Sequence, residues 1–138
     1  MASLYQRLGG SDACRRIIAA FYASVPTDPV LSRLYPGDLG AAEERLALFL
    51  VQWTGGPEEY QARRGHPRLR LRHLPFVIGR AERDAWMAQM SAAVAAEVAD
   101  PNAASELLGA FAKTADFLVN AAGLSLRGAP EVAGDAGA

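Results

Sequence analysis

Apolar residues recur every three or four positions in four stretches of the chain, which is the period of an amphipathic helix. No two stretches alternate between apolar and polar residues as a pair of half-exposed strands would. The pattern therefore predicts an all-α fold whose main helices span Ser11–Val25, Leu39–Trp53, Ala81–Val98 and Pro101 to about Gly123.

Several of these helices carry residues that usually begin or stop a helix. Ser11 is a favourable N-cap for the first helix, and Asp100 followed by Pro101 supplies the N-cap and first residue of the last. The second helix is stopped by the run Gly55-Gly56-Pro57. Ser3–Leu8 is long enough for one further helical turn.

The remaining segments read as connections. Thr27–Asp38 contains two prolines and predicts a loop or short turns, and Glu58–Arg64 predicts a second connection. Residues 125–138 are rich in Gly, Ala, Pro and acid, a composition that buries too little surface to fold. We therefore expect one domain over residues 1–124 and a disordered tail over residues 125–138.

Both histidines of the chain, His66 and His73, lie in the arginine-rich stretch Gly65–Phe76. Its alternating Arg and Leu residues could form a half-exposed strand, but no other stretch offers a strand partner. We favour a short helix between Pro67 and Pro75, which would place His73 and Leu69 on one face. The stretch would then present a histidine to the interior, beside arginines that face an anionic group.

Composition excludes several classes of protein. The chain has 138 residues, 51% of them apolar and 21% charged, and a net charge of −1, so nothing favours nucleic acid or an anionic membrane as a partner. No apolar run is long enough to span a bilayer, and no leader pattern is present. With Cys14 as its one cysteine, the chain is expected in the cytoplasm.

The candidate chemistry centres on one histidine. The chain lacks a Gly-rich phosphate loop and a CxxC pair, and its two histidines lack the usual spacing of zinc ligands. A histidine together with apolar residues, aromatic residues and arginines would suit a haem, which needs an axial ligand, apolar walls and cations for its propionates. From composition alone, a structural His73 and a boundary Tyr22 bonded to backbone are the commoner alternatives.

A set of short segments between about Leu4 and Ala122 narrows these alternatives. In their order and spacing the sequence resembles the truncated haemoglobins of the second group, which are bacterial globins with a two-over-two helical sandwich around haem. The segments that carry the resemblance are Phe21-Tyr22, Leu34-Tyr35-Pro36, Ala41-Ala42-Glu43-Glu44-Arg45-Leu46, Phe49-Leu50, Gly55-Gly56-Pro57, Gly65-His66-Pro67, Leu69-Arg70, Arg72-His73, Pro75-Phe76, Glu82-Arg83-Asp84-Ala85-Trp86 and Leu118-Val119-Asn120.

The resemblance implies haem b (iron protoporphyrin IX) as cofactor and assigns roles around it. His73 corresponds to the proximal iron ligand, with Leu69 and Phe76 as walls of the proximal side. The distal hydrogen-bond donors correspond to Tyr22, Tyr35 and Trp86. The remaining implied haem contacts are Ala42 and Leu46 next to the bound ligand, Phe49 and Met90, and Arg45, Arg72 and Tyr60 for the propionates. We expect a structural role for His66 in preference to a haem contact.

The resemblance also implies ligands and leaves the activity open. Dioxygen and other small diatomic molecules are the expected ligands, and three distal donors would give tight oxygen binding and slow release. The alternative is a haem redox enzyme that acts on nitric oxide or peroxide and needs an electron donor. A small helical interaction domain without haem is a third interpretation. Either a monomer or a homodimer fits the family.

Overall fold

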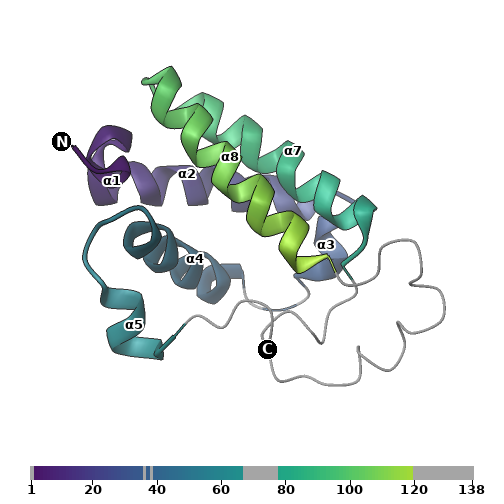
Figure 1. The fold of residues 1–138 in the computed structure, drawn as a ribbon. Helices are drawn as coiled ribbons and strands as arrows, with labels where there is room; N and C mark the ends of the chain where they lie inside the picture. The colour runs from purple at the N-terminus through teal and green to yellow at the C-terminus, as the bar shows by residue number, and fades with distance from the viewer. Residues whose placement is uncertain (1, 36, 38, 67–77, 120–138) are drawn as a thin grey trace.

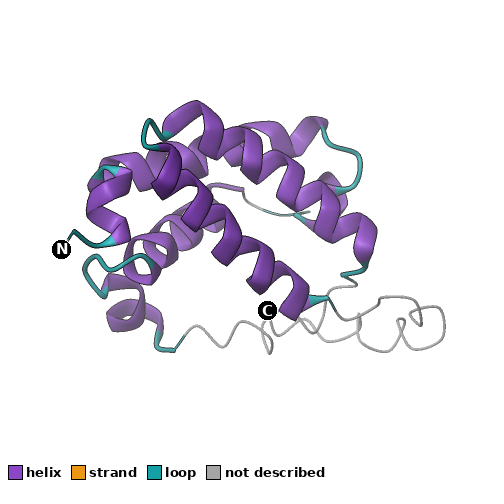
Figure 2. Cartoon of the chain, turned by 45° about the horizontal axis from the view of Figure 1, so that its top comes forward, coloured by secondary structure: helices purple, strands orange, loops and turns teal. Residues whose placement is uncertain are grey.

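The computed structural model describes residues 2–35, 37, 39–66 and 78–119, and all regular structure in this part of the chain is helical. The all-α prediction is confirmed (Figures 1 and 2). In chain order the elements are α1 (Leu4–Leu8), α2 (Gly10–Ser24), the 3-10 turn η1 (Val25–Thr27), α3 (Leu31–Leu34), α4 (Leu39–Trp53), α5 (Glu59–Arg64), α7 (Arg80–Glu97) and α8 (Pro101–Leu118).

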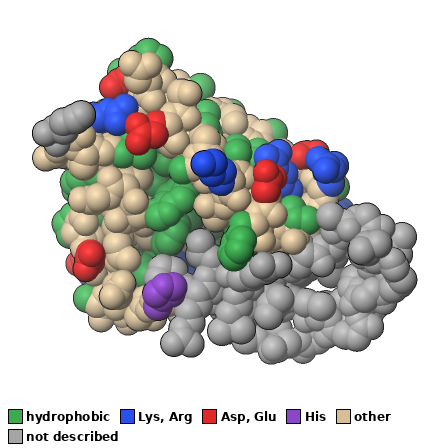
Figure 3. Space-filling model, viewed as in Figure 1, with side chains coloured by type: hydrophobic (Ala, Val, Ile, Leu, Met, Phe, Trp, Pro, Cys, Tyr) green, Lys and Arg blue, Asp and Glu red, His purple; other side chains and the backbone are tan. Residues whose placement is uncertain are grey.

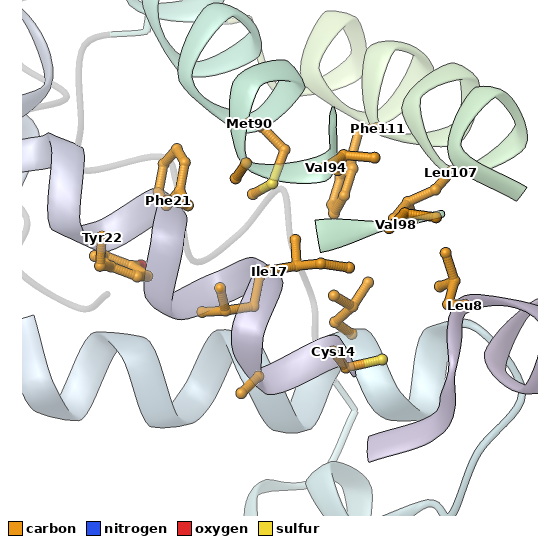
Figure 4. Packing of buried hydrophobic residues seen from close by; sticks show 14 of the residues in the cluster. Leu8, Cys14, Ile17, Phe21, Tyr22, Met90, Val94, Val98, Leu107 and Phe111 are labelled. Atoms are coloured by element: carbon orange, nitrogen blue, oxygen red, sulfur yellow. The ribbon is translucent and has the colours of Figure 1, made fainter. Parts of the chain in front are cut away.

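The long helices form two layers. Helix α2 packs against α4 in one layer and against α7, which pairs with α8 in the other layer. Figure 1 shows α7 and α8 lying side by side across α2. Buried side chains fill the space between the layers, among them Ile17 and Phe21 of α2, Met90 and Val94 of α7 and Leu107 of α8 (Figure 4).

Two predictions about helix ends are confirmed, namely the limits of α4 and the N-cap of α8. Helix α4 has the predicted limits. At the start of α8, an Asp100 carboxylate oxygen accepts hydrogen bonds from the backbone N–H groups of Asn102 at 2.9 Å and Ala103 at 3.3 Å. Asp100 therefore caps two of the amide groups that the first turn of a helix leaves without partners.

Three predictions about helices are wrong, and they concern the N-cap of α2, the segment Glu59–Arg64 and the end of α8. The N-cap of α2 is Gly9 in the left-handed conformation (φ 115°), and Ser11 lies inside the helix with its hydroxyl 2.8 Å from that of Tyr5. Segment Glu59–Arg64 is a helix and not a connection. Helix α8 ends at Leu118 and does not continue to Gly123.

Other predictions fall on residues that the structure does not describe. These are the short helix between Pro67 and Pro75, with His73 on it, and the disordered tail over residues 125–138. In the described part of the chain, no helix is both long enough and apolar enough to cross a membrane.

Candidate functional site

Helix α4 carries apolar residues on two different faces. Ala47, Leu50 and Val51 are at most 6% exposed and belong to the core between the layers. A second row of apolar residues, spaced by four, three and four positions, is only half-buried: Ala42, Leu46, Phe49 and Trp53. We call this row the apolar strip of α4. A continuous half-exposed apolar surface is a common feature of ligand sites.

Aromatic rings link this strip to the other long helices. Phe49 stacks on Trp53 with ring centroids 5.5 Å apart, and Trp53 lies 5.2 Å from Phe111 of α8. Phe111 in turn lies 5.1 Å from Trp86 of α7, which lies 5.2 Å from Phe21 of α2. Figure 3 shows apolar side chains gathered between α4 and α8. The rings therefore join the strip to all the long helices.

Three polar groups meet at the far end of this series of rings. Tyr22 at the end of α2 is 6% exposed, and its ring lies edge-on to that of Tyr35 at 5.3 Å. The hydroxyl of Tyr35, which directly follows α3, lies close enough to the polar groups of Trp86 and Tyr22 for both to lower its pKa. Since an indole N–H can only donate, a bond between Trp86 and Tyr35 has the Tyr35 oxygen as its acceptor. We call Tyr22, Tyr35 and Trp86 the donor cluster.

Burial keeps both phenols of the donor cluster protonated. Loss of hydration raises the pKa of Tyr22 well above its usual value, and the neighbouring Tyr35 raises it further. Burial also raises the pKa of Tyr35, although the nearby polar groups of Trp86 and Tyr22 oppose the rise. Part of Tyr35 is exposed, so it is mainly the hydroxyl end that is enclosed. Both hydroxyls are therefore hydrogen-bond donors at neutral pH.

The other predicted site residues are more scattered. Tyr60 of α5 is 5% exposed and its ring lies edge-on to Phe49 at 5.8 Å. Arg45 is exposed on α4, and its charge lowers the pKa of Tyr22 slightly against the stronger effect of burial. Met90 is completely buried within the core, and its predicted haem contact stays a prediction. His66 is exposed just beyond α5.

The predicted proximal side lies outside the described residues. This applies to His73, Leu69, Arg72 and Phe76, whose roles stay predictions. No site role was predicted for Trp53 or Phe111, although the structure places Trp53 beside Phe49 and Phe111 beside Trp86. Both residues recur at helical spacing, and periodicity alone cannot separate a ring that faces a ligand from one that faces the core.

The described residues fit a flat apolar group with a polar ligand on one side. The apolar strip would cover the face of such a group, and Phe111, in ring contact with both Trp53 and Trp86, links the strip to the donor cluster. Two layers of helices with this arrangement define a globin of the two-over-two class.

The comparisons with known proteins agree with that class. The family model of bacterial-like globins matches residues 3–120, and the chain belongs to that family. It is 34% identical over 111 residues to the group 2 truncated haemoglobin YjbI of Bacillus subtilis, covering 80% of this chain and 84% of the relative.

Solved structures show the same likeness. A thermostable haemoglobin from Thermobifida fusca is 45% identical with a TM-score of 0.83, over 86% of this chain and 98% of that one. The group II truncated haemoglobin of Bacillus anthracis is 32% identical with a TM-score of 0.84, over 88% of this chain and 94% of that one. The predicted two-over-two globin fold is therefore confirmed.

Proposed function

We propose that this globin binds haem b along the apolar strip of α4 and holds dioxygen tightly through the donor cluster. The observation that carries the proposal is that one indole N–H and two protonated phenols meet, and that ring contacts through Phe111 link them to a half-buried apolar strip. Buried polar groups are costly unless they have partners, so a cluster of donors inside an apolar site suits a polar ligand held there.

The residues that would hold the haem come from both sides of the site. His73 would ligate the iron through one ring nitrogen, and Leu69 and Phe76 would cover the proximal face. The apolar strip would cover the distal face, while Arg45, Arg72 and Tyr60 would pair with the propionates. When bound, the haem supplies a ferrous iron that takes up dioxygen and other diatomic ligands.

The donor cluster sets how long a ligand stays. The Trp86 indole can only donate, so the Tyr35 oxygen would accept from it and the Tyr35 proton would be free to turn to a ligand. If Tyr22 and Trp86 turn to the ligand as well, three bonds of about 1 kcal/mol each would slow release by roughly a hundredfold. Such slow release suits sensing or chemistry better than bulk transport.

An absorption spectrum of the purified protein tests the haem itself. We expect a Soret band that shifts on reduction with dithionite and again with oxygen and with carbon monoxide. In His73→Ala the band should weaken and recover when imidazole is added. A colourless protein that also fails to take up added hemin would contradict the proposal.

Oxygen release from the ferrous protein tests the donor cluster. Tyr35→Phe removes one donor and keeps the ring, and Trp86→Phe removes one donor together with the five-membered ring of the indole, so each should speed release by roughly fivefold. Stopped-flow mixing measures both rates against the wild type. A release rate in Trp86→Phe within twofold of the wild type would show that Trp86 does not slow oxygen release.

The same cluster favours a second candidate, a haem redox enzyme that acts on nitric oxide or peroxide. Protonated phenols and an indole N–H could polarise a bound peroxide as readily as they hold oxygen. Such an enzyme needs an external electron donor. Steady-state turnover of peroxide with a reducing substrate, compared with the same amount of free haem, separates the two candidates.

A further inference from the structure

One carboxylate joins the short helix α3 to the long helix α7. The first carboxylate oxygen of Asp28 accepts hydrogen bonds from the backbone N–H groups of Val30 at 2.9 Å and Leu31 at 3.0 Å. Its second oxygen accepts a hydrogen bond from the side-chain amide of Gln89 at 3.1 Å. Asp28 therefore caps the start of α3 and at the same time binds that start to α7.

The two ends of this connection lie next to the donor cluster. Helix α3 has only four residues, and Tyr35 follows its last residue directly. Gln89 lies three residues after Trp86, so both project from neighbouring positions on α7. Figure 1 shows α3 beside the first part of α7, and the two helices are in contact.

Helix α3 needs such support because a single turn is not stable alone. Leu31 is fully buried, and Leu34 and Tyr35 also pack against the core, but apolar contacts have little directional preference. The hydrogen bond between Asp28 and Gln89 adds a directional contact at the start of the segment. This bond sets the start of the segment that leads to Tyr35 relative to α7.

We infer that Asp28 and Gln89 are positioning residues, and that their hydrogen bond holds the Tyr35 hydroxyl against the Trp86 indole. The inference rests on the proposed function, because it assigns these residues to the control of ligand release. It concerns two residues outside both the donor cluster and the apolar strip. The charged side chain of Arg33, bonded to the carbonyl of Pro29 at 3.0 Å, is the nearest cation to Asp28 on its own segment.

The carboxylate form of Asp28 persists at neutral pH. Hydrogen bonds from the backbone of Leu31 and from Gln89 lower the pKa of Asp28 below its usual value. All three bonds are therefore present under the conditions in which oxygen release is measured.

The test variant is Gln89→Met, which removes the bond to Asp28 but keeps the length of the side chain and the cap of α3. The matched control is Glu97→Met, which removes an exposed ion pair between α7 and Arg16 of α2 (3.3 Å) about three turns from Trp86. Loosening one hydrogen bond of the cluster should speed oxygen release roughly two- to fivefold in Gln89→Met and leave Glu97→Met unchanged.

A second measurement follows the geometry without ligand kinetics. The chain has two tryptophans, Trp53 and Trp86, so hydrogen exchange of their indole N–H groups can be followed separately by NMR in the ferrous carbon monoxide complex. We expect faster exchange at Trp86 in Gln89→Met, with Trp53 as an internal reference that does not change. Asp28→Asn should stay near the wild type, because its carbonyl can still cap α3 and the Gln89 amide can turn to accept from it.

The outcomes separate this inference from the proposed function. The inference is overturned if Gln89→Met matches the wild type in both measurements, or if Glu97→Met changes them as much, while Tyr35→Phe still speeds release. If Tyr35→Phe has no effect on release, the proposed role of the cluster fails. In that case exchange at Trp86 still decides whether Gln89 holds the indole in place.

Discussion

The two faces of α4 are both apolar but differ in their surroundings. One face, with Ala47, Leu50 and Val51, is closed off by α2 and the rest of the core. The other is the apolar strip, which is only half-buried although part of it packs against the core. Burying apolar surface stabilises a fold by about 25 cal/mol per Å², so the strip has not gained everything it could.

This contrast separates residues that build the fold from residues that are available to a ligand. The closed face should respond to any change in volume, whether or not haem is bound. The strip should respond mainly through haem.

The largest effect is expected on the closed face. Leu50→Ala deletes a fully buried side chain and leaves a cavity, which should cost about 2 to 5 kcal/mol of unfolding free energy. Urea denaturation of the haem-free protein measures this loss. A cost below about 1 kcal/mol would show that the closed face is loosely packed.

A larger side chain at the end of the closed face should also lower the unfolding free energy. A Cβ atom on Gly56 would lie 2.6 Å from the ring of Tyr5 and 2.9 Å from Val51, so Gly56→Ala should cost about 1 to 3 kcal/mol. The matched control is Gly109→Ala in α8, where a Cβ would meet nothing within 4 Å. That variant should gain about 0.5 to 1 kcal/mol from helix propensity, so the two thermal shifts should have opposite signs.

A substitution in the apolar strip should weaken haem retention more than it lowers the unfolding free energy of the haem-free protein. Leu46→Gln keeps a side chain of similar length and removes apolar contact area, worth about 1.5 to 3 kcal/mol if haem covers it. Transfer of haem to excess apomyoglobin should therefore be roughly ten- to a hundredfold faster, while the haem-free protein unfolds at nearly the same urea concentration. Equal losses in both measurements would mean that the strip is ordinary core.

The smallest effect is expected from pH. Because burial raises the pKa of Tyr22 and Tyr35, both phenols stay protonated, and oxygen release should change less than twofold between pH 6 and 9. In the unfolded chain they ionise near pH 10, so their share of the stability is complete below pH 10 and is lost as the pH rises further. Tyr22→Phe should make urea midpoints less sensitive to pH in that alkaline range.

The helices could be predicted from the sequence because their apolar period and stop signals agree. The limits of α4 and the cap at Asp100 follow from that agreement. The predicted start of α2 was wrong because Gly9, in the left-handed conformation, is both the C-cap of α1 and the N-cap of α2. Ser11 therefore lies inside the helix and does not cap it. Helix α5 was missed because Tyr60 is the one buried residue in its six.

The donor cluster was predicted from family resemblance and not from periodicity. Tyr22, Tyr35 and Trp86 are far apart in the sequence, and only a fold brings them together. The two faces of α4 could not be separated, because residues 46–51 are all apolar and fit a helix that is buried on every side. The bond between Asp28 and Gln89 spans 61 positions and leaves no local signal.

A hemin titration of the haem-free protein tests the haem surface most directly, comparing the wild type with Leu46→Gln/Phe49→Gln and with the surface control Glu97→Met. We expect a Soret change that saturates at one hemin per chain in the wild type and the control, and binding at least tenfold weaker in the strip variant. Binding in the strip variant that matches the wild type, or a wild type that never saturates, would contradict the claim that the apolar strip of α4 is the haem surface.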